Sequence, residues 1–252
     1  MTRRAPALPW LEPGQDFPPV DTAWAADAPA PGLLAAGGAL DAPTLRRAYA
    51  HGIFPWFSEG QPILWWSPDP RMVLQVADFR LHDSLRKQLR AGLRSGRIEL
   101  RFDHDFTAVI GHCAGAARPG QHGTWILPEM VDAYTELHRL GVAHSVETWW
   151  DGVLAGGLYC VGIGQAVFGE SMFSLRSNAS KIALAALVAF CRAHGLRSID
   201  CQQNTAHLGS LGAREMPRER FVQSMRMAVA LPPPVWRFDS VYWDHLFHAH
   251  AT

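Results

Sequence analysis

Three consecutive strand patterns between residues 145 and 173 constrain the fold of this chain more than any other feature of its sequence. Residues 145–150 show the alternation of a β-strand, and the Asp151-Gly152 pair that follows is typical of a tight hairpin turn. Residues 153–161 and 165–173 continue the pattern. We therefore expect an antiparallel ribbon of three strands in the second half of the chain.

Segments with helical periodicity flank this ribbon on both sides. Asp41 can cap a helix that ends at Gly52, and Pro128 and Gly141 mark the start and the end of another. In chain order, we expect helices over residues 41–52, 80–101, 128–141, 177–195 and 217–229, and short strands over 53–57, 63–68 and 197–202. Helices combined with a largely antiparallel sheet predict the α+β fold class.

A Pro-Asp-Pro sequence at residues 68–70 marks the boundary that we expect between two domains. Residues 1–68 would form an N-terminal arm and a small domain, and residues 69–252 a larger domain. The arm is rich in proline and alanine, so we expect it to be extended and to pack only locally, through Trp10 and Trp24.

Composition indicates a globular protein without a bulk charge. Apolar residues make up 48% of the chain, and Lys plus Arg equal Asp plus Glu at 23 each, so any contact with nucleic acid requires a local patch. Residues 80–101 are the basic segment, and its most relevant side chains are Arg80, Arg86, Lys87, Arg90 and Arg94. They form either a solvated face opposite a leucine stripe or a patch that follows nucleic-acid phosphates.

The four cysteines are scattered and form no Cys-x-x-Cys pair, so we expect reduced thiols and no zinc site. The longest apolar stretch, residues 182–191, is too short to span a bilayer. Arg3 and Arg4 could begin a twin-arginine signal, but no apolar segment follows them. We therefore expect a cytoplasmic monomer without membrane contact, metal or small-molecule cofactor.

Polar side chains in apolar surroundings are candidates for chemistry. Glu170 interrupts an apolar strand, where it either faces water or, if buried, could hold a substrate ammonium group. Asp200 and Gln202 end a predicted strand and, by strict alternation, share one face while Cys201 points to the other. Cys201 as a nucleophile with His207 as its base is an alternative, but no thiol-activating motif surrounds it, and a structural cysteine is the simpler interpretation.

Two tryptophans occupy irregular positions. Trp56 follows a proline, and Trp125 lies in a Gly-Thr-Trp loop. Tryptophans usually fill cores, but rings at such positions can also stack on a nucleic-acid base, and both interpretations stay open.

Several long stretches occur in a characteristic order between about residue 32 and residue 220. They read GIFPWFSEGQPILWWSPDPR, GTWILPEM, AHSVETW, FGESMFS followed by SNASK, and IDCQ followed by HLGSLGA. In all of them the chain resembles the bacterial leucyl/phenylalanyl-tRNA–protein transferases. The resemblance implies transfer of leucine or phenylalanine, and less readily methionine, from leucyl-tRNA or phenylalanyl-tRNA to proteins that begin with arginine or lysine, which creates a degradation signal. It also implies a small N-terminal domain beside a larger one similar to the acetyltransferases that use acetyl-coenzyme A.

The resemblance assigns roles to single residues. Trp56 and Trp125 match the tryptophans that hold the terminal adenosine of the tRNA, and Glu170 matches the active-site glutamate. Asp200 and Gln202 match the proposed catalytic pair. We expect Asp200 to orient Gln202, whose amide oxygen would accept a hydrogen bond from the attacking amine.

The resemblance also implies a pocket for the transferred side chain, lined by Leu158, Leu187 and Ile199. Leu187 stands where an aromatic residue can occur, which leaves the preference between leucine and phenylalanine open.

Two further alternative functions remain. An acetyl-coenzyme A-dependent acetyltransferase needs a pyrophosphate loop that residues 192–197 match only in part. A non-catalytic RNA-binding module would have no use for the carboxylates and the amide described above.

Overall fold

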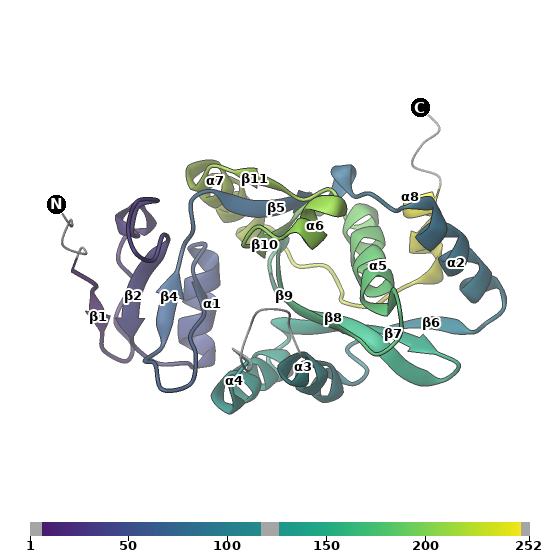
Figure 1. Ribbon diagram of the computed structural model, residues 1–252, viewed down its shortest axis with the longest axis horizontal. Helices are drawn as coiled ribbons and strands as arrows, with labels where there is room; N and C mark the ends of the chain where they lie inside the picture. Colours follow the sequence, from purple (N-terminus) through teal and green to yellow (C-terminus); the bar gives the residue numbers. More distant parts are fainter. Residues whose placement is uncertain (1–6, 117–125, 248–252) are drawn as a thin grey trace.

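The computed structural model describes residues 7–116 and 126–247 and contains a four-stranded and a seven-stranded sheet (Figure 1). The smaller sheet has the order β1-β2-β4-β3. Its strands are β1 (Trp10–Leu11), β2 (Leu33–Gly37), β3 (Phe54–Pro55) and β4 (Leu64–Trp66). Helix α1 (Ala42–Ala50) lies between β2 and β3 in the chain, and the carboxylate of Asp41 caps it by accepting the backbone N–H of Thr44 at 2.8 Å. The predicted cap and the two aromatic strands are confirmed.

The larger sheet has the order β11-β5-β10-β9-β8-β7-β6. Neighbouring strands are antiparallel except β9 and β10, which are parallel. The strands are β5 (Arg71–Gln75), β6 (Ile98–Phe102), β7 (Ala143–Trp150), β8 (Val153–Ile163), β9 (Ala166–Ser174), β10 (Ser198–Gln202) and β11 (Arg214–Met216). The predicted ribbon is confirmed as β7, β8 and β9. Asp151 and Gly152 both have positive φ, 54° and 79°, as a tight hairpin turn requires.

Helices cover both faces of the larger sheet (Figure 1). On one face lie α3 (Phe106–Gly115) and α4 (Pro128–Arg139), and on the other lies α5 (Ala179–Ala193), with α2 (Asp83–Arg94) and α8 (Asp244–Phe247) beside it. The remaining helices are α6 (Ala206–Ser210), α7 (Arg218–Val229) and the 3-10 turns η1 (Val20–Thr22), η2 (Val76–Asp78) and η3 (Ser240–Trp243). Two hydrophobic cores result, and the α+β class is confirmed. Within the described part of the chain, no helix is long and apolar enough to cross a membrane.

Helix α5 approaches strand β8 closely because β8 carries a glycine at the contact. A Cβ atom on Gly156 would lie 2.6 Å from the Cβ of Ala179, the first residue of α5. The hydroxyl of Thr148 donates a hydrogen bond to the carbonyl oxygen of Ala179 at 2.9 Å and fixes the same turn. Only a residue without a side chain permits this spacing. The contact sets the position of the helix that carries Leu184 and Leu187.

The N-terminal arm packs differently from the prediction. Strand β1 pairs in parallel with β2, so the arm is part of the sheet. Leu11 is buried and Phe17 packs on the ring of Trp65 at 4.8 Å, whereas Trp10 is 61% exposed. The prediction that Trp10 anchors the arm is wrong, because the alternation of the strand turns Leu11, not Trp10, into the core. The change from one sheet to the other falls between β4 and β5; the division into domains at residue 68 stays a prediction.

The single helix predicted over residues 80–101 is wrong in its second half. Helix α2 ends at Arg94, Gly96 has a φ of 68°, and β6 begins at Ile98. Gly96 therefore terminates the helix, and the side chain of Ile98 folds back onto Gly92, where a Cβ would lie 2.2 Å from it. Periodicity predicted none of α3, α6 and β11.

Candidate active site

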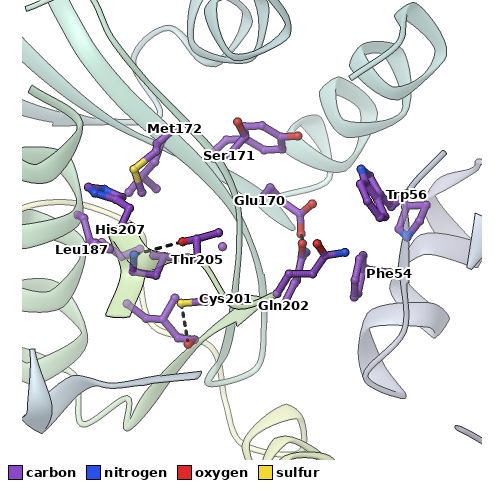
Figure 2. A pocket seen from close by; sticks show the side chains of 18 residues that line it. Phe54, Trp56, Glu170, Ser171, Met172, Leu187, Cys201, Gln202, Thr205 and His207 are labelled. Atoms are coloured by element: carbon purple, nitrogen blue, oxygen red, sulfur yellow. Dashed lines mark hydrogen bonds between the residues drawn. The ribbon is translucent and has the colours of Figure 1, made fainter. Parts of the chain in front are cut away.

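A cavity of about 570 Å³ opens between the two sheets. Its walls come from β3 and the residue after it, from β8, β9 and β10, from α5, and from residues 203–208. Figure 2 shows Trp56 on one side of this cavity, facing Glu170 and Gln202, with Leu187 and His207 toward the other end. One end of the cavity is therefore polar and the other largely apolar.

Glu170, in the wall formed by β9, receives hydrogen bonds from three side chains. The Tyr49 hydroxyl donates to Oε1 at 2.7 Å, the Tyr134 hydroxyl to Oε2 at 3.3 Å, and the Gln202 amide nitrogen to Oε1 at 2.8 Å. The two tyrosine hydroxyls also lie within hydrogen-bonding distance of each other. Each hydroxyl has a single hydrogen, so while Glu170 is ionised only two of the three contacts among these hydroxyls and the carboxylate are hydrogen bonds at one time. Burial raises the pKa of Glu170 to about 7, although the bond from Tyr49 acts in the opposite direction. Its charge therefore changes close to neutral pH.

Asp200 lies behind the cavity wall and is paired with a buried arginine. Arg71 donates from Nε to Oδ1 at 2.8 Å and from Nη2 to Oδ2 at 2.6 Å. Oδ1 of Asp200 also accepts the backbone N–H of Gln202 at 2.9 Å. Asp200 and Gln202 are therefore connected, but through the backbone of Gln202, while its amide side chain bonds Glu170.

Strict alternation along β10 fails at its last residues. The register shifts between Asp200 and Gln202, and Gln202 has a φ of 61°. Cys201 and Gln202 consequently both line the cavity, and Asp200 does not. The prediction that Cys201 points away from Gln202, and that Asp200 and Gln202 share a face, is wrong because a β-bulge resets the side-chain directions.

The structure also bears on the cysteine alternative. Burial raises the pKa of Cys201 to about 12, and the charge of Asp200 adds to the effect. Burial lowers the pKa of His207. The thiol therefore stays protonated near neutral pH and is a poor nucleophile. In the ranges 7–116 and 126–247, no group of three or more His, Cys, Asp or Glu side chains is placed to hold a metal ion.

The family model described as leucyl/phenylalanyl-tRNA protein transferase matches residues 73–226, and the model of its N-terminal domain matches residues 38–69. The chain belongs to this family. A relative from Albidiferax ferrireducens, named leucyl/phenylalanyl-tRNA–protein transferase, is 61% identical over 246 residues, which cover 98% of this chain and 97% of the relative. A relative of the same name from a Polaromonas species is 59% identical over 242 residues, 96% of this chain and 95% of the relative. A solved structure of a functionally unknown conserved protein from Staphylococcus epidermidis aligns with a TM-score of 0.36 and 11% identity over 73% of this chain and 68% of that one, a likeness too weak to carry an argument.

Most residues carried over from the transferase family lie around one cavity. Trp56, Leu158, Leu187 and Ile199 line it together with Glu170 and Gln202. Trp125 lies outside the described residues. The placement is observed, whereas the roles of the residues stay predictions.

The basic side chains lie elsewhere. Helix α2 is beyond α5 as seen from the smaller sheet (Figure 1). Arg80, Lys87, Arg90 and Arg94 are exposed, and Arg86 is half-buried. A ligand that contacts both α2 and the cavity has to extend over much of the protein, as a tRNA would. The phosphate-binding role of these side chains stays a prediction.

Three residues of the site were not predicted from the sequence: Arg71, Tyr49 and Tyr134. Arg71 carries a usable signal, because it is a charged residue within the apolar strand β5 and has no exposed surface. The tyrosines carry none, since buried tyrosines on the apolar faces of α1 and α4 are indistinguishable from ordinary core residues.

Proposed function

We propose that this chain is an aminoacyltransferase that moves leucine or phenylalanine, and less readily methionine, from charged tRNA to the α-amine of proteins that begin with arginine or lysine. Membership in the transferase family and the names of the relatives support the reaction. The observation that carries the proposal to particular residues is the cavity itself. Its lining combines the apolar side chains of Leu158, Leu187 and Ile199 with the polar side chains of Glu170 and Gln202.

The donor would bind by three features of the cavity. The ring of Trp56 is half-buried and available to stack on the terminal adenine. The leucine or phenylalanine side chain would enter the apolar end. Tyr49 and Tyr134 hold the carboxylate of Glu170 in place. Once ionised, this carboxylate would pair with the α-ammonium group of the aminoacyl ester. Burial raises the pKa values of both tyrosines well above their ordinary values, so they remain hydrogen-bond donors.

The chemical step requires alignment more than strong base catalysis. The aminoacyl ester is already activated, and a peptide α-amine with a pKa near 8 is partly neutral at physiological pH. The amine nitrogen attacks the ester carbonyl carbon, the bond to the ribose oxygen breaks, and a proton lost by the amine balances the one that this oxygen gains. Gln202 donates its amide N–H to Glu170, which leaves its amide oxygen as the acceptor for the attacking amine. An amide is a poor base, so Gln202 would position the amine and stabilise developing charge.

The test is transfer of radiolabelled leucine from leucyl-tRNA to a protein that begins with arginine, beside a matched protein that begins with alanine, without ATP or acetyl-coenzyme A. We expect incorporation only into the arginine protein. Incorporation that requires acetyl-coenzyme A, or none from either leucyl-tRNA or phenylalanyl-tRNA, would reject the proposal. Gln202→Ala should lower the single-turnover rate, and an unchanged rate would remove the role given to this residue.

The same proposal places the protein in the cytoplasm, where charged tRNA and newly exposed protein N-termini meet. Contact of α2 with the tRNA backbone is part of it, since a donor anchored only by its terminal nucleotide would leave most of its phosphates without partners.

A further inference from the structure

We infer that Arg71 is a positioning residue of this site, which holds the Trp56 side and the Gln202 side of the cavity in one fixed arrangement. The inference rests on the proposed transfer reaction and adds a residue that neither touches the cavity nor belongs to the set carried over from the family. Arg71 is the first residue of β5, the strand that pairs with β10.

Each of the three nitrogens of the Arg71 guanidinium donates a hydrogen bond inside the protein. The guanidinium has no exposed surface, and it makes two charge-assisted hydrogen bonds to Asp200, at 2.8 and 2.6 Å. Nη1 donates to the carbonyl oxygen of Gly52 at 3.2 Å. The rings of Phe54 and Phe221 pack on it, with Cζ 4.7 Å from each centroid. A planar fork with this many directional partners has no equivalent in lysine.

Through Gly52 and Phe54, Arg71 holds the wall that carries Trp56. Phe54 and Pro55 form β3, and both line the cavity together with Trp56. The hydroxyl of Ser67 donates to the same Gly52 carbonyl at 3.2 Å. The segment that presents Trp56 is thus attached to Arg71 immediately before it reaches the cavity.

Through Asp200, Arg71 holds the bulge that aims Gln202. The positive φ of Gln202 is unusual for a residue with a side chain and persists only where the surroundings impose it. Asp200 imposes it by accepting the backbone N–H of Gln202, and Arg71 fixes Asp200 with both of its oxygens engaged. Asp200 is therefore an anchor for the bulge, and its negative charge is matched by Arg71.

Arg71 also acts on Glu170 without touching it. Its positive charge lowers the pKa of Glu170, whereas the negative charge of Asp200 raises it. Loss of the arginine charge would leave Asp200 unmatched and move the titration of Glu170 to higher pH. This gives a readout that a purely structural arginine would not have.

The experiment compares Arg71→Lys, which keeps the charge and loses the fork, with Arg71→Met, which loses both. Arg192→Lys is the matched control, because Arg192 also bonds backbone carbonyls but lies at the far end of α5. The steady-state kcat and the KM for leucyl-tRNA are measured on each folded protein between pH 6 and pH 9. The acceptor amine titrates equally in all of them, so differences between profiles report the enzyme.

For Arg71→Lys we expect kcat to fall about 100-fold, as misplacement of a reacting group predicts. The KM for leucyl-tRNA should rise as well, because the wall that carries Trp56 loses an anchor, and the pH profile should not move. For Arg71→Met the profile should also move to higher pH, and adding Asp200→Asn should move it back without restoring kcat. Arg71→Lys with the kcat of the control would overturn the inference, and so would equal losses in both variants with unmoved profiles. A wild-type protein that transfers nothing fails the proposed function instead, and the inference falls with it. If Arg71→Met does not fold, Arg71→Lys alone decides through kcat.

Discussion

Replacing Glu170 with glutamine should stabilise the protein strongly at pH 8 and only slightly at pH 5. In the folded chain burial raises the pKa of this carboxyl from 4.5 to about 7. A raised pKa means that the fold favours the protonated form. The favourable contribution is complete below about pH 4.5 and is lost as the pH rises through about 7. Glutamine is neutral throughout and keeps an oxygen for the Tyr49 hydroxyl.

The size of the effect follows from the two pKa values. The difference between 4.5 and about 7 corresponds to about 3 kcal/mol in the free energy of unfolding, at about 1.4 kcal/mol for each pKa unit. The wild-type protein carries nearly the whole cost at pH 8 and about a quarter of it at pH 5, where the unfolded carboxyl is already mostly ionised. Glu170→Gln should therefore gain up to about 3 kcal/mol at pH 8. The same variant should lose transfer activity, because it cannot pair with an ammonium group.

The assay is urea unfolding followed by circular dichroism at pH 5, 6.5 and 8, on the wild type, Glu170→Gln and Glu136→Gln. Glu136 is an exposed carboxylate of α4 and serves as the control. The gain from Glu170→Gln should grow steadily with pH, and the control should stay flat. A gain of equal size at pH 5 and pH 8, or none at pH 8, would show that burial does not raise the pKa of Glu170 and would refute the reasoning.

Three further predictions concern binding. Trp56→Ala should remove stacking worth about 1–3 kcal/mol and raise the KM for charged tRNA; an unchanged KM would return this ring to the core. Leu187→Ala should raise the ratio of phenylalanine to leucine transfer at least about tenfold, measured with the two charged tRNAs in competition, and a constant ratio would place the side chain of the donor elsewhere. Arg86→Ala combined with Lys87→Ala should raise KM and flatten its dependence on salt, whereas Arg226→Ala, an exposed arginine of α7, should do neither. Equal salt slopes in the two variants would make α2 an ordinary surface helix.

Local patterns predicted those parts of the fold in which each residue acts on its near neighbours. The ribbon of β7, β8 and β9 follows from alternation and one turn sequence, and the cap of α1 from a single aspartate. The helix predicted for the basic segment extended too far because the run of charged residues continues beyond it. The leucine stripe ends at Leu93, and Ile98, Leu100 and Phe102 alternate with charged residues as in a strand. The positive φ of Gly96 ends the helix, and hydrophobic periodicity alone does not reveal such a backbone angle.

The residues of the site also fall into those that the sequence predicts and those that it does not. Glu170, Asp200 and Gln202 were predicted because polar residues in apolar segments are conspicuous in any sequence. The partners that give them their properties come from remote positions: Tyr49 is 121 residues from Glu170, and Arg71 is 129 residues from Asp200. Pairings over such separations depend on the order of strands in the sheet. The bulge at Gln202 depends on one dihedral angle, which no side-chain pattern encodes.

The close approach of α5 to Gly156 means that the shape of the cavity depends on a residue that does not line it. Any side chain at this position of β8 would push the first turn of α5 away from the sheet. Leu184 and Leu187, further along the same helix, would move with it and reshape the apolar end. If the apolar end receives the donor side chain, as proposed, two family members with the same cavity residues would differ in donor preference through this one position. A comparison of cavity linings alone would miss the cause.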